Sequence, residues 1–170
     1  MMGKIILWTS ITVLFFSLFE AAILSNLIFL PVLPDLVLLI VVYVSFMNSS
    51  IIGATSGFIS GLLMDFLSAS PVGLNALTKT VTGFVAGKFS GSFNKNKLLI
   101  PALMGCCATI LKALLILFLS FFFGENILVY RIAGSVFWLE VLANTLCAPL
   151  MFALLGLFTT FFIEDTRLHE

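Results

Sequence analysis

Long apolar runs with very few charges inside them restrict most strongly how this chain can fold. The run from residue 5 to about residue 30 contains a single charge, Glu20, and similar runs cover residues 98–123 and 140–163. A helix of about 20 apolar residues is long enough to cross a bilayer. Each of the three runs therefore predicts a transmembrane helix.

The composition excludes a soluble domain. Hydrophobic residues make up 61% of the chain and charged residues 9%, whereas soluble domains average about 45–50% apolar and about 25% charged residues. So few charges could not keep this much apolar surface in water, and membrane lipid is the expected surrounding. The formal net charge is zero, so we expect no nucleic-acid partner.

Prolines and polar turns divide the rest of the chain into three shorter apolar spans. Pro31 and Pro34 end the first run, and the next run, residues 36–47, would be only about 18 Å long as a helix. It must therefore gain length from Pro34 and Asp35, or lie at a locally thin site that protein covers. We predict one all-α integral membrane domain over residues 1–170, a bundle of about six transmembrane helices at approximately 5–30, 34–47, 51–67, 72–93, 98–123 and 140–163.

The distribution of basic residues predicts the orientation of the bundle. Basic residues are enriched in cytoplasmic loops, and with six spans most of them share one side with both termini. The basic residues on the side of the termini are Lys4, Lys88, Lys95, Lys97 and Arg167. Arg131 lies on the opposite side, and Lys79 lies at the entrance of a helix on that opposite side. We therefore expect both termini in the cytoplasm. A cleaved signal peptide is the alternative for residues 1–25, although no Ala-x-Ala site follows that run.

Glycines recur every fourth residue in two neighbouring spans. They are Gly53, Gly57 and Gly61 in one span and Gly83, Gly87 and Gly91 in the next. In lipid, small residues let helix backbones approach closely, and this spacing favours a right-handed crossing. Two interpretations remain open: internal packing of the bundle, or a groove for another protein's helix, which we would seek first along Gly53, Gly57 and Gly61.

Charged residues near the outer ends of two neighbouring spans predict an ion pair. Asp65 lies one helical step beyond Gly61, and Lys79 lies in the first turns of the following antiparallel span. Each charge would be costly alone at that depth. We therefore expect Asp65 and Lys79 to pair near the outer boundary of the membrane.

Other polar residues lie deeper within the apolar runs. Glu20 and Lys112 fall at almost the same depth of two parallel spans, and an isolated charge there costs roughly 2.5–3.5 kcal/mol on insertion scales. We expect the two to form a buried ion pair or to share a polar cavity. Asp35 precedes the short second span, and Asn144 of the last span can hydrogen-bond across helices. Pro149 can kink that span.

The sequence carries no constellation that predicts an enzyme. It contains no HExxH motif and no phosphate-binding loop, and its single histidine, His169, lies in the carboxyl tail. Cys106, Cys107 and Cys147 lie in apolar runs without metal-ligand spacing, which is typical of small buried side chains. We therefore expect no catalytic residue, no metal site and no cofactor.

The order of these motifs resembles the rod shape-determining protein MreD family. The first part of the resemblance consists of Pro34, Asp35, Leu36, Tyr43, Gly53, Gly57, Gly61, Asp65, Ser68, Ser70, Pro71, Gly73, Leu74, Ala76, Leu77, Gly83 and Gly87. The second part consists of Asn144, Ala148, Pro149 and Leu150. Asn75 stands where many relatives carry His, and Lys79 stands where they often carry an apolar residue. With the matching length and span count, the resemblance covers nearly the whole chain.

The resemblance implies a non-enzymatic subunit of the bacterial cell-elongation machinery in the inner membrane. Proteins of that family bind MreC, a single-span membrane protein with a large outer domain. Together they connect the cytoskeletal protein MreB to the glycosyltransferase RodA and its penicillin-binding transpeptidase, and so to peptidoglycan synthesis. The resemblance also implies a bundle similar to the substrate-binding subunits of energy-coupling-factor transporters.

A small-solute carrier, similar to those vitamin-binding subunits, is the alternative function. Buried charges such as Glu20 and Lys112 would serve a binding pocket. Few polar residues converge in the sequence, however, whereas a ligand pocket needs several polar groups. A channel would need a repeated ring of charges or a carbonyl-lined filter, and the sequence shows neither.

Overall fold

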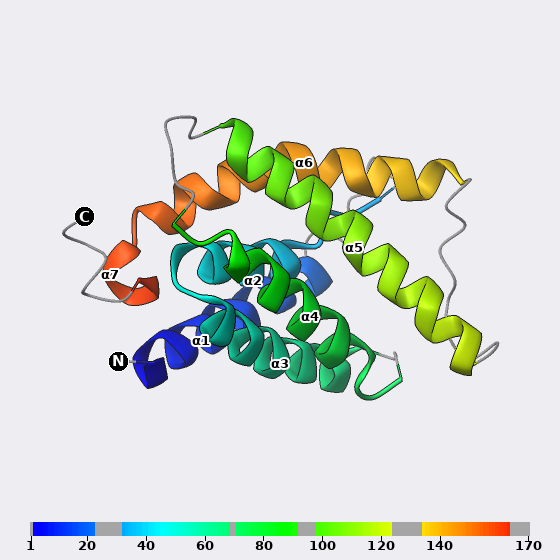
Figure 1. Cartoon of the computed structure of the whole chain (residues 1–170), viewed down its shortest axis with the longest axis horizontal. Helices are drawn as coiled ribbons and strands as arrows, with labels where there is room; N and C mark the ends of the chain where they lie inside the picture. Colours follow the sequence, from blue (N-terminus) through cyan, green and yellow to red (C-terminus); the bar gives the residue numbers. More distant parts are fainter. Residues whose placement is uncertain (1, 23–31, 69–70, 92–97, 124–133, 164–170) are drawn as a thin grey trace.

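The described part of the chain is a bundle of helices without a strand. The computed structural model describes residues 2–22, 32–68, 71–91, 98–123 and 134–163. The helices are α1 (Met2–Ala22), α2 (Leu36–Met47), α3 (Ser50–Leu67), α4 (Leu74–Lys88), α5 (Leu99–Phe123), α6 (Ser135–Gly156) and α7 (Thr159–Phe162) (Figure 1). The prediction of an all-α fold is confirmed.

Among the described residues, four helices are long and apolar enough to cross a membrane, namely α1, α3, α5 and α6. α2 has 12 residues and α4 has 15, so both are shorter than the ~20 residues of a full span. The predicted last span, 140–163, is wrong in its bounds, because α6 runs from Ser135 to Gly156 and α7 follows. The predicted span ends 23–30 and 92–93, as well as Lys95, Lys97, Arg131 and Arg167, lie outside the described residues.

The short helix α2 forms the centre of the bundle. Its residues Leu36 to Phe46 are all buried, and those from Val37 to Val44 have no exposed surface. A helix that is apolar on every side must be covered on every side, and α1, α3, α4, α5 and α6 all contact α2. The expectation that protein covers the short second span is therefore confirmed.

Polar residues turn the chain between α2 and α3. The backbone N–H of Asn48 donates to the carbonyl of Val44 and ends α2. The Ser49 hydroxyl accepts a hydrogen bond from the backbone N–H of Ile52 at 3.4 Å and caps α3. Ser90, just after α4, donates to the Asn48 carbonyl at 2.6 Å. The turn is thereby held against the end of α4.

The glycines of α3 lie against the backbone of α4. A β-carbon built on Gly57 would overlap the backbone carbonyl of Lys79, and one on Gly53 would overlap that of Gly83. Gly61 meets the backbone of Asn75 and Ala76 in the same way. Because α4 fills this groove, the structure supports the first of the two interpretations, internal packing, over a groove for another protein's helix along Gly53, Gly57 and Gly61. The groove is an internal packing surface.

The three glycines that recur in the predicted span 72–93 have two different roles. Gly83 lies against Gly53 and Gly87 against the backbone of Ser50, so both belong to the α3–α4 contact. Gly91 has a φ of +86°, and a β-carbon added to it would meet no atom within 4 Å. Its predicted role in helix packing is wrong, since α4 ends at Lys88 and Gly91 makes a left-handed turn that glycine adopts without steric cost.

The short helix α7 packs against the end of the central helix α2. The side-chain amide of Asn48 donates to the carbonyl of Phe162 at 2.7 Å, and the ring of Phe162 contacts that of Tyr43 edge-on. The ring of Phe161 lies 4.4 Å from that of Trp8 in α1, measured between centroids. These contacts explain why the chain turns after Gly156 rather than continuing as one long helix.

Helices α5 and α6 pack tightly at one point and cross the face of the bundle (Figure 1). A β-carbon on Gly105 would lie 2.7 Å from the β-carbon of Ala148 and 2.9 Å from the carbonyl oxygen of Asn144. Glycine is therefore required at this close approach. Farther toward their connected ends the two helices share a small apolar cluster, formed by Ala113, Phe137 and Val141.

Candidate functional site

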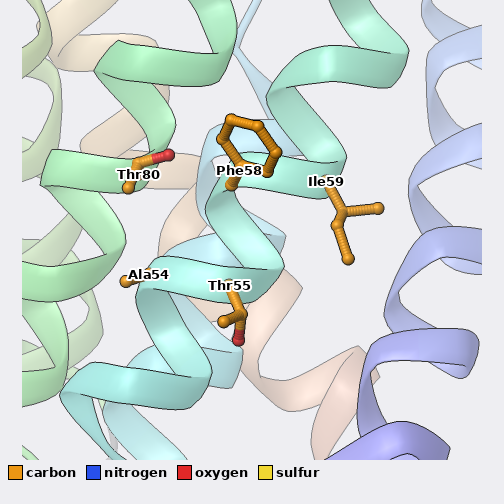
Figure 2. A pocket seen from close by; sticks show the side chains of 5 residues that line it. All are labelled: Ala54, Thr55, Phe58, Ile59 and Thr80. Carbon is orange, nitrogen blue, oxygen red and sulfur yellow. The ribbon is translucent and has the colours of Figure 1, made fainter.

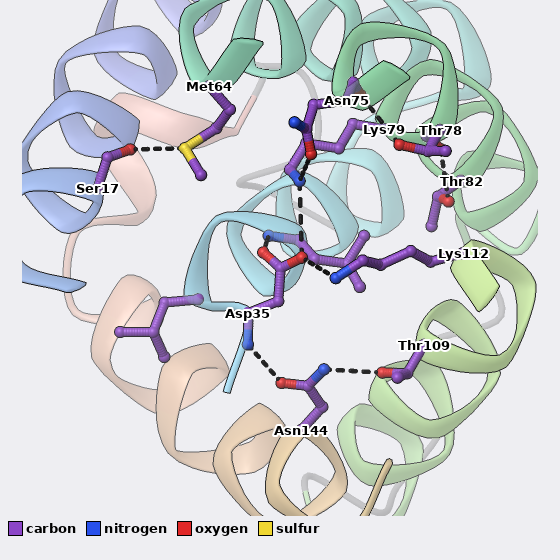
Figure 3. A network of polar contacts seen from close by, with 12 residues as sticks. Ser17, Asp35, Met64, Asn75, Thr78, Lys79, Thr82, Thr109, Lys112 and Asn144 are labelled. Atoms are coloured by element: carbon purple, nitrogen blue, oxygen red, sulfur yellow. Dashed lines mark hydrogen bonds and ion pairs between the residues drawn. The ribbon is translucent and has the colours of Figure 1, made fainter. Parts of the chain in front are cut away.

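Asp35 lies at the centre of a group of buried polar side chains at the first turn of α2 (Figure 3). One carboxylate oxygen accepts a hydrogen bond from the backbone N–H of Leu38 at 2.9 Å, which caps the helix. The other oxygen accepts from Lys112 of α5 at 2.7 Å and lies 3.6 Å from the ammonium of Lys79 of α4. Asp35 thus joins three helices.

Helices α5 and α6 contribute a second set of contacts. The ammonium of Lys112 also donates to the carboxylate of Glu140 at 3.0 Å. Asn144 accepts a hydrogen bond from the backbone N–H of Asp35 at 2.8 Å and donates to the hydroxyl of Thr109 at 2.9 Å (Figure 3). The structure thereby places Asn144 in hydrogen bonds that cross between helices.

Lys79 is almost completely buried, with 1% of its surface exposed. Its ammonium lies 3.6 Å from Asp35 and donates to the side-chain oxygen of Asn75 at 3.4 Å. A buried ammonium without such partners would be strongly destabilising. The position of Lys79 inside the bundle therefore depends on Asp35.

Glu20 reaches the same region from α1. Its carboxylate accepts a hydrogen bond from the backbone N–H of Leu36 at 2.6 Å, at the positive end of α2. The prediction of a direct Glu20–Lys112 ion pair is wrong, because Lys112 pairs with Asp35 and Glu140. The two residues nonetheless belong to one group. We call Glu20, Asp35, Lys79, Lys112, Glu140 and Asn144 the charge cluster.

Glu140 is the member of the charge cluster that sequence reasoning missed, since the apolar pattern marks it only as the start of the last span. Glu140 and Asn144 are four residues apart, however, and side chains at that spacing share one face of a helix. In the structure both face Asp35 and Lys112. This spacing is the signal that could have placed Glu140 beside Asn144.

Asp65 has a different role from the one predicted. Its carboxylate accepts hydrogen bonds from the backbone N–H groups of Gly73, Asn75 and Ala76 at 2.8, 2.9 and 3.1 Å. The predicted Asp65–Lys79 ion pair is wrong, since Lys79 pairs with Asp35 instead. Gly73, the residue before α4, has no side chain to cap the helix, so Asp65 satisfies its free N–H groups.

Replacing Asp65 with Ala should destabilise the protein by about 2 kcal/mol, since it leaves three N–H groups of a buried helix start without an acceptor. We expect a lower melting temperature of the purified protein in detergent. Asp65→Asn keeps one acceptor oxygen and should cost less. A melting temperature unchanged by Asp65→Ala would contradict the capping role.

A shallow hollow lies on the outer face of α3, away from the charge cluster. It has a volume of about 270 Å³ and is lined by Ala54, Thr55, Phe58, Ile59 and, from α4, Thr80 (Figure 2). None of these side chains is charged, and the hydroxyl of Thr55 is bonded to carbonyls of its own helix. The hollow therefore lacks the converging polar groups of a solute site.

The described residues offer no cluster of side chains suited to a metal ion. They contain no group of three or more His, Cys, Asp or Glu side chains that could hold a metal ion. Cys106, Cys107 and Cys147 are free thiols. The charged side chains of the cluster bind one another and the start of α2, so what this arrangement does is join helices.

Comparison with known proteins agrees with the motifs. A family model described as rod shape-determining protein MreD matches residues 2–158. Searches of curated proteins and of solved structures each gave no match. The matched region includes α1 to α6 and every residue of the charge cluster. The chain therefore belongs to the MreD family of rod shape-determining membrane proteins.

Proposed function

We propose that this protein is a non-enzymatic scaffold of the bacterial elongation machinery and binds MreC in the inner membrane. The observation that carries this proposal is that the buried charges of the bundle are bound to one another rather than arranged around a pocket. Such a cluster fixes the relative positions of helices. The family's role in determining rod shape supports the same assignment.

The outer surface suits contact with other helices and with lipid. Large apolar side chains are exposed on α1, α5 and α6, for example Phe15 (63%), Phe118 (63%) and Leu146 (68%). Helices in lipid associate by close packing and hydrogen bonds rather than by hiding apolar surface from water. An apolar exterior of this kind can hold the single membrane helix of MreC.

We further propose that α2 and α4 count as spans, which gives six, with both termini in the cytoplasm. Lys4 in the first turn of α1 and Lys88 in the last turn of α4 are exposed, and basic residues favour the cytoplasmic side. From this position the protein would help MreC couple MreB to RodA, its transpeptidase and peptidoglycan synthesis. In the proposed arrangement the bundle is similar to substrate-binding subunits of energy-coupling-factor transporters.

Co-purification tests the proposed partner. Tagged protein co-expressed with MreC should retain MreC in a fixed ratio through affinity and size-exclusion steps in detergent. The matched control is MreC whose membrane helix is replaced by that of an unrelated single-span protein, and it should be lost. Equal recovery of both versions, or of neither from well-folded protein, would contradict binding through the membrane helix.

A thermal-shift assay separates the scaffold from the carrier alternative. A panel of vitamins and metal cations should leave the melting temperature of the purified protein unchanged. The reason is that the polar side chains of the charge cluster already bind one another. A ligand that binds only the folded state raises the melting temperature, and the rise grows with the logarithm of the ligand concentration once that exceeds Kd. A rise specific to one compound would favour the carrier over the scaffold.

A further inference from the structure

Two contacts that hold α5 and α6 to the start of α2 meet at a single residue, Asp35. Its backbone N–H donates to Asn144 of α6 at 2.8 Å, and its carboxylate accepts from Lys112 of α5 at 2.7 Å. The contact between Thr109 and Asn144, in contrast, lies between α5 and α6 themselves. Asp35 therefore connects the α5–α6 pair to the rest of the bundle.

Each side of this connection holds an ion pair of its own, and on the bundle side Glu20 also accepts a hydrogen bond from the backbone N–H of Leu36. On the bundle side Asp35 lies 3.6 Å from Lys79, and on the other side Lys112 lies 3.0 Å from Glu140. If α5 and α6 moved away from α2, each side would keep an ion pair. Separation here avoids the large cost of leaving one buried charge without a partner.

Buried apolar residues of α5 and α6 form two separate clusters, one on each side of the charge cluster. The main core contains Ala108 of α5 and Ala148, Met151, Phe152 and Leu155 of α6, which lie on one side of the charge cluster along these helices. On the other side, Ala113, Phe137 and Val141 form a separate cluster between α5 and α6. We call the segments 109–123 and 135–144 the outer arm, and this second apolar cluster lies between them.

Proline interrupts α6 close to the point where the outer arm ends. Pro149 lies five residues after Asn144 of the outer arm and directly after the core residue Ala148. Proline removes one backbone hydrogen bond of a helix and permits a sharp kink. The close contact of Gly105 with Ala148 lies beside it and keeps α5 attached to α6 during such a movement.

We propose that the outer arm opens away from α2 by bending α6 at Pro149, and that Asp35 is the latch that holds it closed. The cluster then parts into the pairs Asp35–Lys79 and Lys112–Glu140. Opening uncovers the first turn of α2, including Leu36, which is otherwise buried. The protein would thereby have two conformations, closed and open. This proposal does not depend on which partner the protein binds.

Spin-label distances measure the opening directly. Labels at Phe66→Cys in α3 and Leu117→Cys in α5, both exposed positions, are placed in a Cys106→Ala, Cys107→Ala, Cys147→Ala background. Leu117 lies about 18 Å along α5 from Gly105 at about 1.5 Å per residue. A change of about 20° in the kink therefore moves it by about 6 Å. Pulsed paramagnetic resonance resolves such a shift in full-length protein in nanodiscs.

The decisive variant is Lys112→Met with Glu140→Leu, which removes the ion pair between the latch residue Asp35 and α5 and leaves no unpaired charge in the outer arm. We expect the population with the longer distance to rise at least about tenfold, the effect of losing one charged hydrogen bond. Adding Pro149→Ala should reduce that population again. Lys88→Met, which removes an exposed lysine outside the cluster, is the matched control and should leave the distances unchanged.

A milder variant, Thr109→Val, tests the latch even if the double variant does not fold. It removes only the hydrogen bond that orients Asn144 toward Asp35, and it should shift the distances in the same direction to a smaller extent. Distances equal to those of the wild type in Thr109→Val and in any folded double variant would overturn the latch. An open population that Pro149→Ala does not reduce would overturn the hinge.

Discussion

Replacing Asp35 with Leu is expected to prevent the bundle from folding. The substitution removes the cap of α2 and leaves Lys79, which is 1% exposed, without its carboxylate partner. Removing one partner of a buried ion pair costs about 3–5 kcal/mol, which is a large part of the total stability of a domain. Size-exclusion chromatography of the detergent-extracted protein should show aggregate in place of a single folded species.

The control for this experiment is Asp35→Asn. Asparagine keeps an oxygen that can cap α2 and keeps the backbone N–H that donates to Asn144. Its loss of stability should be clearly smaller than that of Asp35→Leu, although the charge is gone. If Asp35→Leu gave wild-type yield and melting temperature, the charge cluster would not organise the bundle.

Replacing Gly57 with Leu is expected to have the second largest effect. The new side chain would enter the backbone of α4 at Lys79, and a backbone carbonyl cannot move aside as a flexible side chain can. Overpacking of this kind costs about 3 kcal/mol or more where the site cannot adjust. Folded yield and capture of MreC should therefore be lost together.

Gly3→Leu is the matched control for Gly57→Leu. Gly3 also lies within a helix, but no atom lies within 4 Å of a β-carbon added there. Its folded yield should equal that of the wild type. If Gly57→Leu lost MreC while its folded yield stayed normal, the face of α3 would be a docking surface, and the internal α3–α4 contact would be contradicted.

The parts of the fold that depend on local sequence were predictable. Apolar runs define α1, α3, α5 and α6, and the shortness of the run at 36–47 predicts that protein must cover it. The glycine spacing predicts close helix contacts. These properties follow from the solvent that each segment meets, so they require no knowledge of how the helices are ordered in space.

The choice of ionic partners could not be predicted in the same way. The expected depth in the membrane predicted that Glu20 lies near Lys112 and Asp65 near Lys79. Many side chains lie at the same depth, however, so depth alone does not identify ionic partners. The start of α2 lies among α1, α4, α5 and α6, so the carboxylate of Asp35 attracts both lysines. Asp65 in turn caps α4, because Gly73 leaves the N–H groups there free. Both outcomes depend on where helix ends meet.

Helix α7 shows a similar limit. Residues 159–162, which are Thr-Thr-Phe-Phe, contain no charge, glycine or proline that would end the predicted span 140–163. The turn after Gly156 depends on contacts with Trp8 and with Asn48, which lie far away in the chain. A contact of this kind has no local signal.

A double-mutant cycle between Asp35 and Lys112 tests most directly the claim that the charge cluster holds the bundle together. The unfolding free energies of Asp35→Asn, Lys112→Met and the double variant are measured by reversible denaturation in mixed micelles. We expect a coupling of about 1.5–3 kcal/mol, as for hydrogen bonds between charged groups. Free energies that add within about 0.5 kcal/mol would show that the two residues do not interact, and would contradict that claim.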